Sequence, residues 1–215
     1  AVQDNIYSAG QTHITVLDST GSKKLASPSL GENAYLTSIV ASGDNVFVAD
    51  AGQLIVWRLD KNGVVIDRIG ERDDDKDIPG FLIPSPYFDV LIDPDGFLWA
   101  VNTGRHQFEN YTNDGGLRSF WAKTSMNVDG FSGCCNPSHA AFLSDGSFVT
   151  AEKGLVRVKV HNPIGEFVSL VAAPDQFDEG TIGLDLAVDS QQRIYVLDPK
   201  RKQVRIFEKV AEASR

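Results

Sequence analysis

The chain has 215 residues and a net charge of −9, with 42% hydrophobic and 23% charged residues. This balance is typical of a globular domain that buries a core, and the acidic excess argues against nucleic acid as a partner. No apolar run approaches the length of a membrane span, and no signal peptide is visible in the residues given.

A unit of two strands recurs along the chain. Each copy has a short apolar strand, a polar turn, and a second strand that ends in an acidic or amide residue. Four segments align on this pattern without gaps: 39–50, 91–102, 141–152 and 187–198. Segment 5–10 matches only the second strand, so we expect the first unit to lack its innermost strand.

Two further strands follow in most copies. The predicted third strands are 13–17, 54–59, 108–111, 156–161 and 204–207, and the predicted fourth strands are 23–27, 64–69, 117–122 and 166–171. The turns between them end at Gly21, Gly63, Gly115 and Gly165, which are 42, 52 and 50 residues apart. Four strands per period of this size, without a helical pattern, predict β-propeller blades and disfavour a β-sandwich.

The blade model makes specific demands on burial. Inner strands 38–41, 90–92, 140–143 and 186–188 should be largely buried on both faces. Third strands such as 156–160 should alternate, with one face toward water. The three tryptophans should fill the gaps between blades. They are Trp57, Trp99 and Trp121. The last blade should lack its outer strand.

The repeat resembles the NHL repeat. The residues that carry the likeness are the D-P-D-G turn at 93–96, the strand-end acids, an Arg-containing loop, and a Gly-Phe connection at 80–81 and again at 130–131. The resemblance implies an all-β propeller of NHL-like four-stranded antiparallel blades. About five blades would be present in one domain over residues 1–215, as the C-terminal part of a six-bladed parent.

The resemblance also bears on location and on one segment. Secreted and periplasmic members are frequent among NHL-like propellers, so it implies a periplasmic or extracellular protein. The Gly-Cys-Cys-Asn-Pro segment at 133–137 is similar to segments of uncharacterised secreted NHL-like propellers, and this likeness brings no known activity with it.

The residues that end the second strands have two interpretations. Oxygen ligands at these places would form a calcium-binding ring, whereas side chains that accept backbone N–H bonds would cap the following loops. The NHL resemblance favours capping, because its repeats carry Asp here regardless of function. The residues are Asp50, Asn102, Glu152 and Asp198.

A second set of polar residues begins the inner strands. Asp89, His139 and Asp185 occupy positions where the NHL repeat usually has Gly. Because inner strands of a propeller start near one mouth of its channel, these side chains would converge on a calcium or transition-metal site, or on a general acid–base site. A hydrated polar channel without a ligand explains them equally well.

The adjacent cysteines Cys134 and Cys135 are the only two in the chain, which excludes a disulfide framework between distant segments. They can bind a soft metal together with His139, form a vicinal disulfide, or simply be two small buried residues. Adjacent Cα atoms lie about 3.8 Å apart, less than the usual disulfide span of roughly 4.4–6.8 Å, so such a bond would be strained and easily reduced. We expect a channel-facing loop within reach of His139.

The loop 102–111 contains Arg105 and His106, and Arg201 and Lys202 lie at the same offsets in the last unit. The two arginines would pack on neighbouring strands or pair with strand-end acids. If they lie near the channel mouth, Arg105 and His106 are ligand-binding candidates. The acidic run 71–77 is predicted to be a solvated loop.

Three classes of function follow. The first is a non-enzymatic propeller that binds a protein, peptide or glycan ligand at its loop or channel face, on the long loops 70–86, 122–136 and 172–183. The alternative is a metal-dependent hydrolase or lyase that uses Asp89, His139 and Asp185. The third is a redox or thiol function of the adjacent cysteines.

Overall fold

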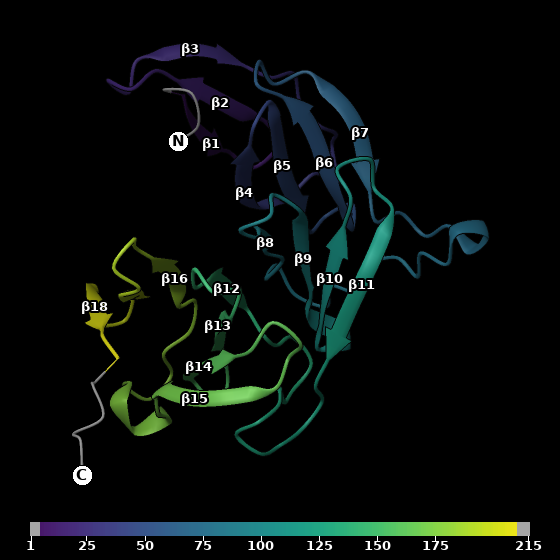
Figure 1. Ribbon diagram of the computed structural model, residues 1–215. Helices are drawn as coiled ribbons and strands as arrows, with labels where there is room; N and C mark the ends of the chain where they lie inside the picture. Colours follow the sequence, from purple (N-terminus) through teal and green to yellow (C-terminus); the bar gives the residue numbers. More distant parts are fainter. Residues whose placement is uncertain (1–4, 210–215) are drawn as a thin grey trace. The chain divides into compact units, whose positions relative to one another are not determined.

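The computed structural model describes residues 5–209, which form eighteen β-strands and three short 3-10 helices (Figure 1). The strands form five antiparallel sheets in which sequence neighbours pair, and this confirms the all-β propeller fold. The chain divides into two compact units, the first ending at Ala122 and the second beginning at Lys123. The described residues include no helix of the length and apolarity needed to cross a membrane.

The first unit contains three sheets. The first has three strands, β1 (Ile6–Ala9), β2 (Ile14–Leu17) and β3 (Lys23–Ala26). The second has four, β4 (Leu36–Ser42), β5 (Asn45–Asp50), β6 (Ile55–Asp60) and β7 (Val65–Ile69). The third has β8 (Val90–Ile92), β9 (Leu98–Asn102), β10 (Gln107–Tyr111) and β11 (Leu117–Ala122).

The second unit contains two sheets. One has four strands, β12 (His139–Phe142), β13 (Phe148–Glu152), β14 (Arg157–His161) and β15 (Phe167–Ala172). The other has three, β16 (Asp185–Val188), β17 (Ile194–Asp198) and β18 (Gln203–Phe207). Within the described residues the first sheet lacks an inner strand and the last lacks an outer one, as predicted.

The turns inside the blades follow from their residue types. In the turn after β6, one carboxylate oxygen of Asp60 accepts bonds from the backbone N–H groups of Asn62 and Val64, at 2.8 and 2.9 Å. Gly63 has a φ of 78°, a conformation that costs a glycine little. An acidic residue followed by glycine therefore closes this hairpin locally, and Asp18 with Gly21 repeats the arrangement.

Apolar side chains from neighbouring sheets form the cores. Within the first unit, Trp57 packs among buried residues from β2, β5 and β6, so it fills the space between two sheets as predicted. Trp99 and Trp121 are also buried, and the Trp121 ring stacks on Phe108 with centroids 4.6 Å apart. In the second unit, a separate core joins the sheet of β12 to that of β16.

The prediction that the inner strands are largely buried on both faces holds for β8 but is wrong for β4 and β16. All residues of β4 are only half-buried, and β16 alternates between exposed and half-buried residues. The second strands β9 and β13 are buried throughout. The reason is that an inner strand is an edge of its sheet and has a neighbour on one side only, whereas a second strand is flanked on both sides.

The predicted alternation of the third strands also fails at β14. Its five residues are all buried, including Arg157 and Lys159, which were expected to face water. The segment 123–131 covers this strand and supplies carbonyl partners for both side chains.

Candidate functional site

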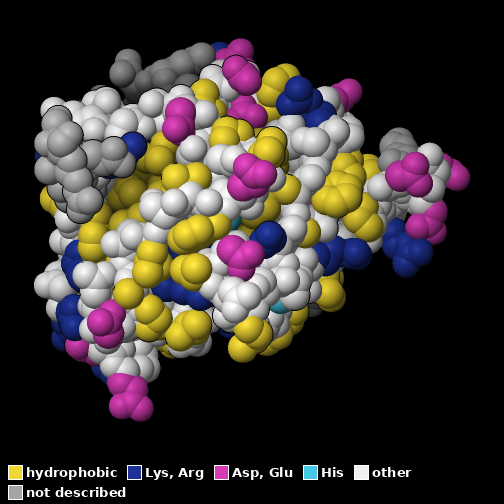
Figure 2. Space-filling view, turned by 60° about the horizontal axis from the view of Figure 1, so that its bottom comes forward, with side chains coloured by type: hydrophobic (Ala, Val, Ile, Leu, Met, Phe, Trp, Pro, Cys, Tyr) yellow, Lys and Arg dark blue, Asp and Glu magenta, His cyan; other side chains and the backbone are white. Residues whose placement is uncertain are grey.

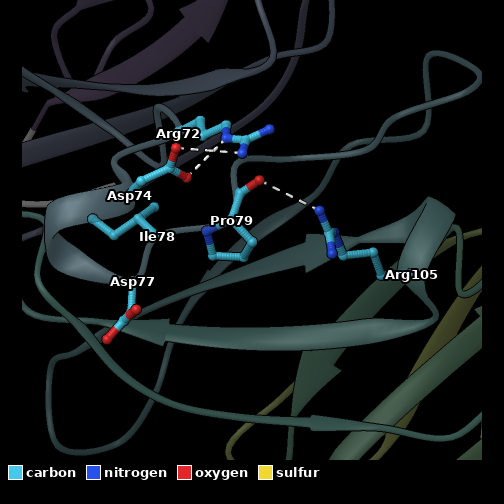
Figure 3. Close-up of a pocket in the computed structure, with 6 residues that line it drawn as sticks. All are labelled: Arg72, Asp74, Asp77, Ile78, Pro79 and Arg105. Carbon is cyan, nitrogen blue, oxygen red and sulfur yellow. Dashed lines mark hydrogen bonds and ion pairs between the residues drawn. The ribbon is translucent and has the colours of Figure 1, made fainter.

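A pocket of about 330 Å³ lies in the first unit, on the loop between β7 and β8. Its lining residues are Arg72, Asp74, Asp77, Ile78, Pro79 and Arg105 (Figure 3). The loop projects from the sheets, with the 3-10 helix η1 (Asp74–Lys76) at its tip (Figure 1). Acidic and basic side chains lie close together on this projection (Figure 2). The acidic run is thus an exposed loop, as predicted.

Local contacts give this loop a defined shape. The backbones of Asp73 and Ile78 exchange two hydrogen bonds of 3.0 and 2.9 Å, which close the base of the turn. The Asp73 side chain caps η1 by accepting the N–H of Asp75. At its start, Gly70 has a φ of +81° and lies directly against the buried Phe81 ring. The pocket wall is therefore held by backbone hydrogen bonds and by the packing of Gly70 on the Phe81 ring.

The two arginines of the pocket differ in their partners. Arg72 is held by Asp74, with bonds of 3.0 and 3.3 Å from its guanidinium to the two carboxylate oxygens. Arg105 donates to the Pro79 carbonyl at 3.3 Å, and no described residue forms a salt bridge with it. Arg105 is therefore the cation of this pocket that remains available to an acidic ligand.

An exposed apolar side chain packs on Gly104, the neighbour of Arg105 in the chain. Leu82 is 50% exposed, and its carbonyl accepts the backbone N–H of Gly104 at 2.8 Å. A Cβ on Gly104 would lie 2.6 Å from the Leu82 side chain and carbonyl oxygen, so only glycine permits this approach. Close packing at Gly104 thus holds the exposed Leu82 against the residue that precedes Arg105, although Leu82 is not among the residues that line the pocket.

Polar groups beneath the pocket hold its loop in place. Asn102 accepts the N–H of Leu82 at 2.9 Å and donates to the buried carboxylate of Glu109 at 2.8 Å. Tyr111 donates to the same carboxylate at 2.6 Å. Burial raises the pKa of Glu109, although these hydrogen bonds oppose the shift. The sequence analysis missed Glu109, and because its strand also contains Gln107 and Asn110, the sequence carried no clear signal of its burial.

Of the two arrangements predicted for the arginines, the salt bridge with a strand-end acid is not the one that their guanidinium groups form. Arg105 does not pair with a strand-end acid, and Arg201 forms its salt bridge with Asp178 at 2.7 Å, outside any strand end. His106, at a φ of 52°, ends the 3-10 helix η2 (Thr103–Arg105) and is half-buried, and it is not among the residues that line the pocket.

The strand-end residues mostly act as caps. Asp50 accepts backbone N–H bonds from Tyr35, Gly52 and Gln53 at 2.9 to 3.1 Å. Asp198 accepts the N–H of Arg201 at 3.1 Å. The capping interpretation is therefore confirmed for both.

Glu152 differs from the other strand-end residues because two buried cations surround it. Its carboxylate contacts Arg157 at 2.6 Å and Lys159 at 2.7 Å. Both cations also donate to the carbonyl of Gly130, at 3.0 and 2.5 Å, and the Lys159 ammonium lies 4.4 Å from the centre of the Phe131 ring.

Burial in this cluster shifts two pKa values. Loss of hydration lowers the pKa of Lys159 to about 8, although Glu152 opposes the shift. Burial and the charge of Lys159 lower the pKa of His161 to about 4. The signal of this ion cluster in the sequence was the spacing of Arg157 and Lys159, which places both side chains on one face of a strand, opposite Glu152. With the ions enclosed, the cluster joins segment 123–131 to β14 and has no access for a substrate.

The predicted metal ligands are divided between the two units. Asp89, in the first unit, is 8% exposed and accepts bonds from the Ser38 hydroxyl at 2.6 Å and the Val90 N–H at 2.9 Å. His139 and Asp185 begin neighbouring inner strands of the second unit, where Asp185 is exposed. Within either unit, the described residues include no group of three His, Cys, Asp or Glu side chains placed to hold a metal. Convergence of the three residues stays a prediction.

The two cysteines carry thiols that are not joined in a disulfide, and they lie in the loop that precedes β12. Their sulfur atoms lie 3.1 Å apart. Cys134 is exposed, whereas Cys135 is 2% exposed, so only one of the two matches the interpretation as small buried residues.

Comparison with known proteins supports the fold. No family model matches the chain, and no curated protein matches its sequence. Similar solved structures include a virginiamycin B lyase from Staphylococcus aureus, 12% identical, with a TM-score of 0.64 over 99% of this chain and 69% of the lyase. A Bacteroides caccae protein of unknown function is 15% identical, with a TM-score of 0.61 over 91% and 67%. BamB from Moraxella catarrhalis is 12% identical, with a TM-score of 0.59 over 100% and 58%.

These neighbours are β-propeller proteins, and at such low identity the likeness shows the fold alone. They include both a lyase and a protein of unknown function, and they assign no function to this chain. Membership of the NHL family stays a prediction.

Proposed function

We propose that this chain is a non-enzymatic propeller that binds a protein segment or peptide at the pocket on the loop between β7 and β8. The observation that carries the proposal is the exposed guanidinium of Arg105, without a salt-bridge partner among the described residues, in a pocket lined also by Ile78 and Pro79. The exposed Leu82 packs on the adjacent Gly104. A cation next to an apolar surface suits a peptide that offers a carboxylate and an apolar side chain. Long loops on a rigid scaffold are common places for such sites.

The chemistry of the pocket narrows the ligand. Guanidinium binds a carboxylate through two parallel bonds, which favours an Asp, a Glu or a free C-terminus. The neighbouring Asp74 and Asp77 penalise a second negative charge on the ligand, and the chain's net charge of −9 gives no long-range attraction to acidic partners. We therefore expect a ligand with one well-placed acidic group, and glycan binding is the less favoured outcome because a neutral glycan would leave the guanidinium without a counterion.

Selection of displayed random peptides on the purified chain tests the proposal. Selected sequences should share one acidic and one adjacent apolar residue. Binding of the corresponding synthetic peptides should weaken about tenfold or more in Arg105→Ala, because a charge-assisted hydrogen bond contributes about 1.5–3 kcal/mol. Arg105→Lys should lie between the two, and Leu82→Ser should weaken binding without changing the preference for an acidic residue.

Lys23→Ala provides the matched control, since it removes an exposed cation from β3. Equal affinity of wild type and Arg105→Ala would contradict the proposed site. Binding on a glycan array, without selection of any peptide, would contradict the proposed ligand class.

A metal-dependent hydrolase or lyase is the second candidate. The virginiamycin B lyase among the structural neighbours favours it, and so does the placement of His139 and Asp185 on adjacent inner strands. Metal analysis of protein purified without chelator tests this candidate. A stoichiometric metal that is lost in both Asp89→Ala and His139→Ala would support it, and protein without bound metal would count against it.

Location outside the cytoplasm is part of the same proposal. It rests on the NHL resemblance, and the low number of thiols is compatible with export. Fractionation of cells that express the full-length protein tests it, and recovery in the cytoplasmic fraction would overturn it.

A further inference from the structure

We propose that Cys134 and Cys135 form a reversible redox site, in which a low-molecular-weight disulfide such as oxidised glutathione converts the two thiols into a vicinal disulfide. The site lies in the second unit and is independent of the proposed peptide pocket. It rests on the distance between the sulfur atoms, on their unequal exposure, and on the hydrogen bonds that hold the loop around them.

The sulfur separation favours bond formation over metal binding. Two thiolates bound to one tetrahedral zinc ion at about 2.3 Å would lie roughly 3.8 Å apart, whereas a disulfide bond is about 2.05 Å long. The observed separation of 3.1 Å is shorter than the first value. A modest rotation of the side chains would bring the sulfurs to bonding distance, although the adjacent Cα atoms make the product strained.

The surrounding loop is held by Asn136. Its side chain donates to the carbonyls of Ser132 and Lys153, at 2.6 and 3.0 Å, and accepts the Lys153 N–H at 2.9 Å. These bonds tie the loop to the turn after β13, so the two thiols are presented by a defined backbone. Because the fold already holds the two thiols close together, little further conformational entropy is lost when the disulfide forms.

The unequal exposure of the thiols sets the order of events. Cys134 is exposed and can reach a small disulfide, whereas Cys135 is buried and is shielded from it. The Cys134 thiolate attacks one sulfur of the oxidant, which forms a mixed disulfide and releases one thiol. The Cys135 thiolate then attacks the Cys134 sulfur and expels the second thiol. Two protein thiols and one small disulfide thus become one protein disulfide and two small thiols.

The environment of Cys134 predicts how this reaction depends on pH. The hydrogen bond between the two thiols and the nearby sulfur of Cys135 raise the pKa of Cys134, and the charge of Lys153 opposes this shift only in part. Since the thiolate is the attacking species, the first step should be slow at neutral pH and should accelerate as the pH rises through the alkaline range. The strained product should be reduced readily by an excess of dithiol.

Intact-mass measurement after incubation with oxidised glutathione and an acid quench tests the proposal. The wild-type chain should lose about 2 Da, the mass of the two hydrogens removed on disulfide formation, and dithiothreitol should restore the original mass. Cys135→Ser should stop at a stable glutathione adduct, because the second thiol is missing. Cys134→Ser should react much more slowly than wild type.

Three results would overturn the proposal: a stable glutathione adduct on wild type, a disulfide-linked dimer, or an unchanged mass under conditions that modify Cys135→Ser. Circular dichroism of both variants shows whether they are folded, and Cys135→Ala provides a second, apolar replacement at the buried position. Peptide mapping of the oxidised chain locates the bond within one fragment.

Discussion

Replacement of the buried Lys159 by methionine should stabilise the second unit at neutral pH. Lys159 has no exposed surface, and burial lowers its pKa from the ordinary 10.5 to about 8. At about 1.4 kcal/mol per pH unit, this difference corresponds to roughly 3 kcal/mol against folding with a charged ammonium. The stabilising contact with Glu152 is already included in that net value.

The contacts left behind decide whether the variant realises this gain. Without Lys159, Glu152 keeps its bond from Arg157 at 2.6 Å, and the Gly130 carbonyl keeps a bond from the same guanidinium at 3.0 Å. The methionine sulfur would lie near the Phe131 ring, a favourable contact of about 0.3–1.5 kcal/mol. We expect the free energy of unfolding to rise by about 1–3 kcal/mol at pH 7.

The pH dependence provides an independent check. Between about pH 8 and 10.5 the unfolded chain binds more protons at Lys159 than the native chain does, so wild-type stability rises with pH across this window. The free-energy cost of burying the charged Lys159 ammonium is fully present below pH 8 and decreases as the pH rises above 8. Lys159→Met lacks this titration, and its advantage over wild type should therefore disappear at about pH 10.

Urea unfolding followed by circular dichroism at pH 7 and pH 10 measures both effects. All three tryptophans lie in the first unit, so their fluorescence does not report on Lys159, and hydrogen exchange at β13 and β14 should accompany the urea data. Lys23→Met, on the exposed strand β3, provides the control and should change little. Destabilisation by about 2 kcal/mol or more at pH 7, or an equal difference at both pH values, would refute the reasoning.

Three further predictions follow from single contacts. Glu152→Gln leaves two buried cations without a counterion, and the same urea measurement should show a loss of about 3–5 kcal/mol, whereas a neutral result would mean that water reaches the cluster. Gly70→Ala should lose about 2 kcal/mol or more by tryptophan fluorescence, because its φ is +81° and the new Cβ would meet the Phe81 ring at 2.0 Å. Burial raises the pKa of Asp189, but hydrogen bonds, chiefly from Arg193, outweigh it and lower this pKa to about 2. Wild type should therefore lose stability as the pH falls from about 4 to 2, and acid titration of Asp189→Asn should show a smaller loss.

The candidate pocket was only partly predictable from the sequence. Arg105 was identified from its offset in the repeat, and the acidic run was correctly predicted to be an exposed loop. That the two segments share a pocket depends on the bond from Arg105 to Pro79, which lies 26 residues away. A local sequence pattern carries no information about contacts between segments this far apart. For the same reason, it could not predict that Arg72 forms a salt bridge with Asp74 while Arg105 forms none with a described residue.

The sequence by itself determined the strands, their order and the turns, because hairpins form between adjacent segments and their signals lie within a few residues. The alternation along a strand also showed that Arg157 and Lys159 share one face. Only the tertiary structure decided what covers that face: Gly130, 29 residues before Lys159, closes over it and converts a predicted solvent-facing pair into a buried ion cluster. Burial depends on which distant segment packs on a strand, and that packing is determined by the tertiary fold of the whole chain.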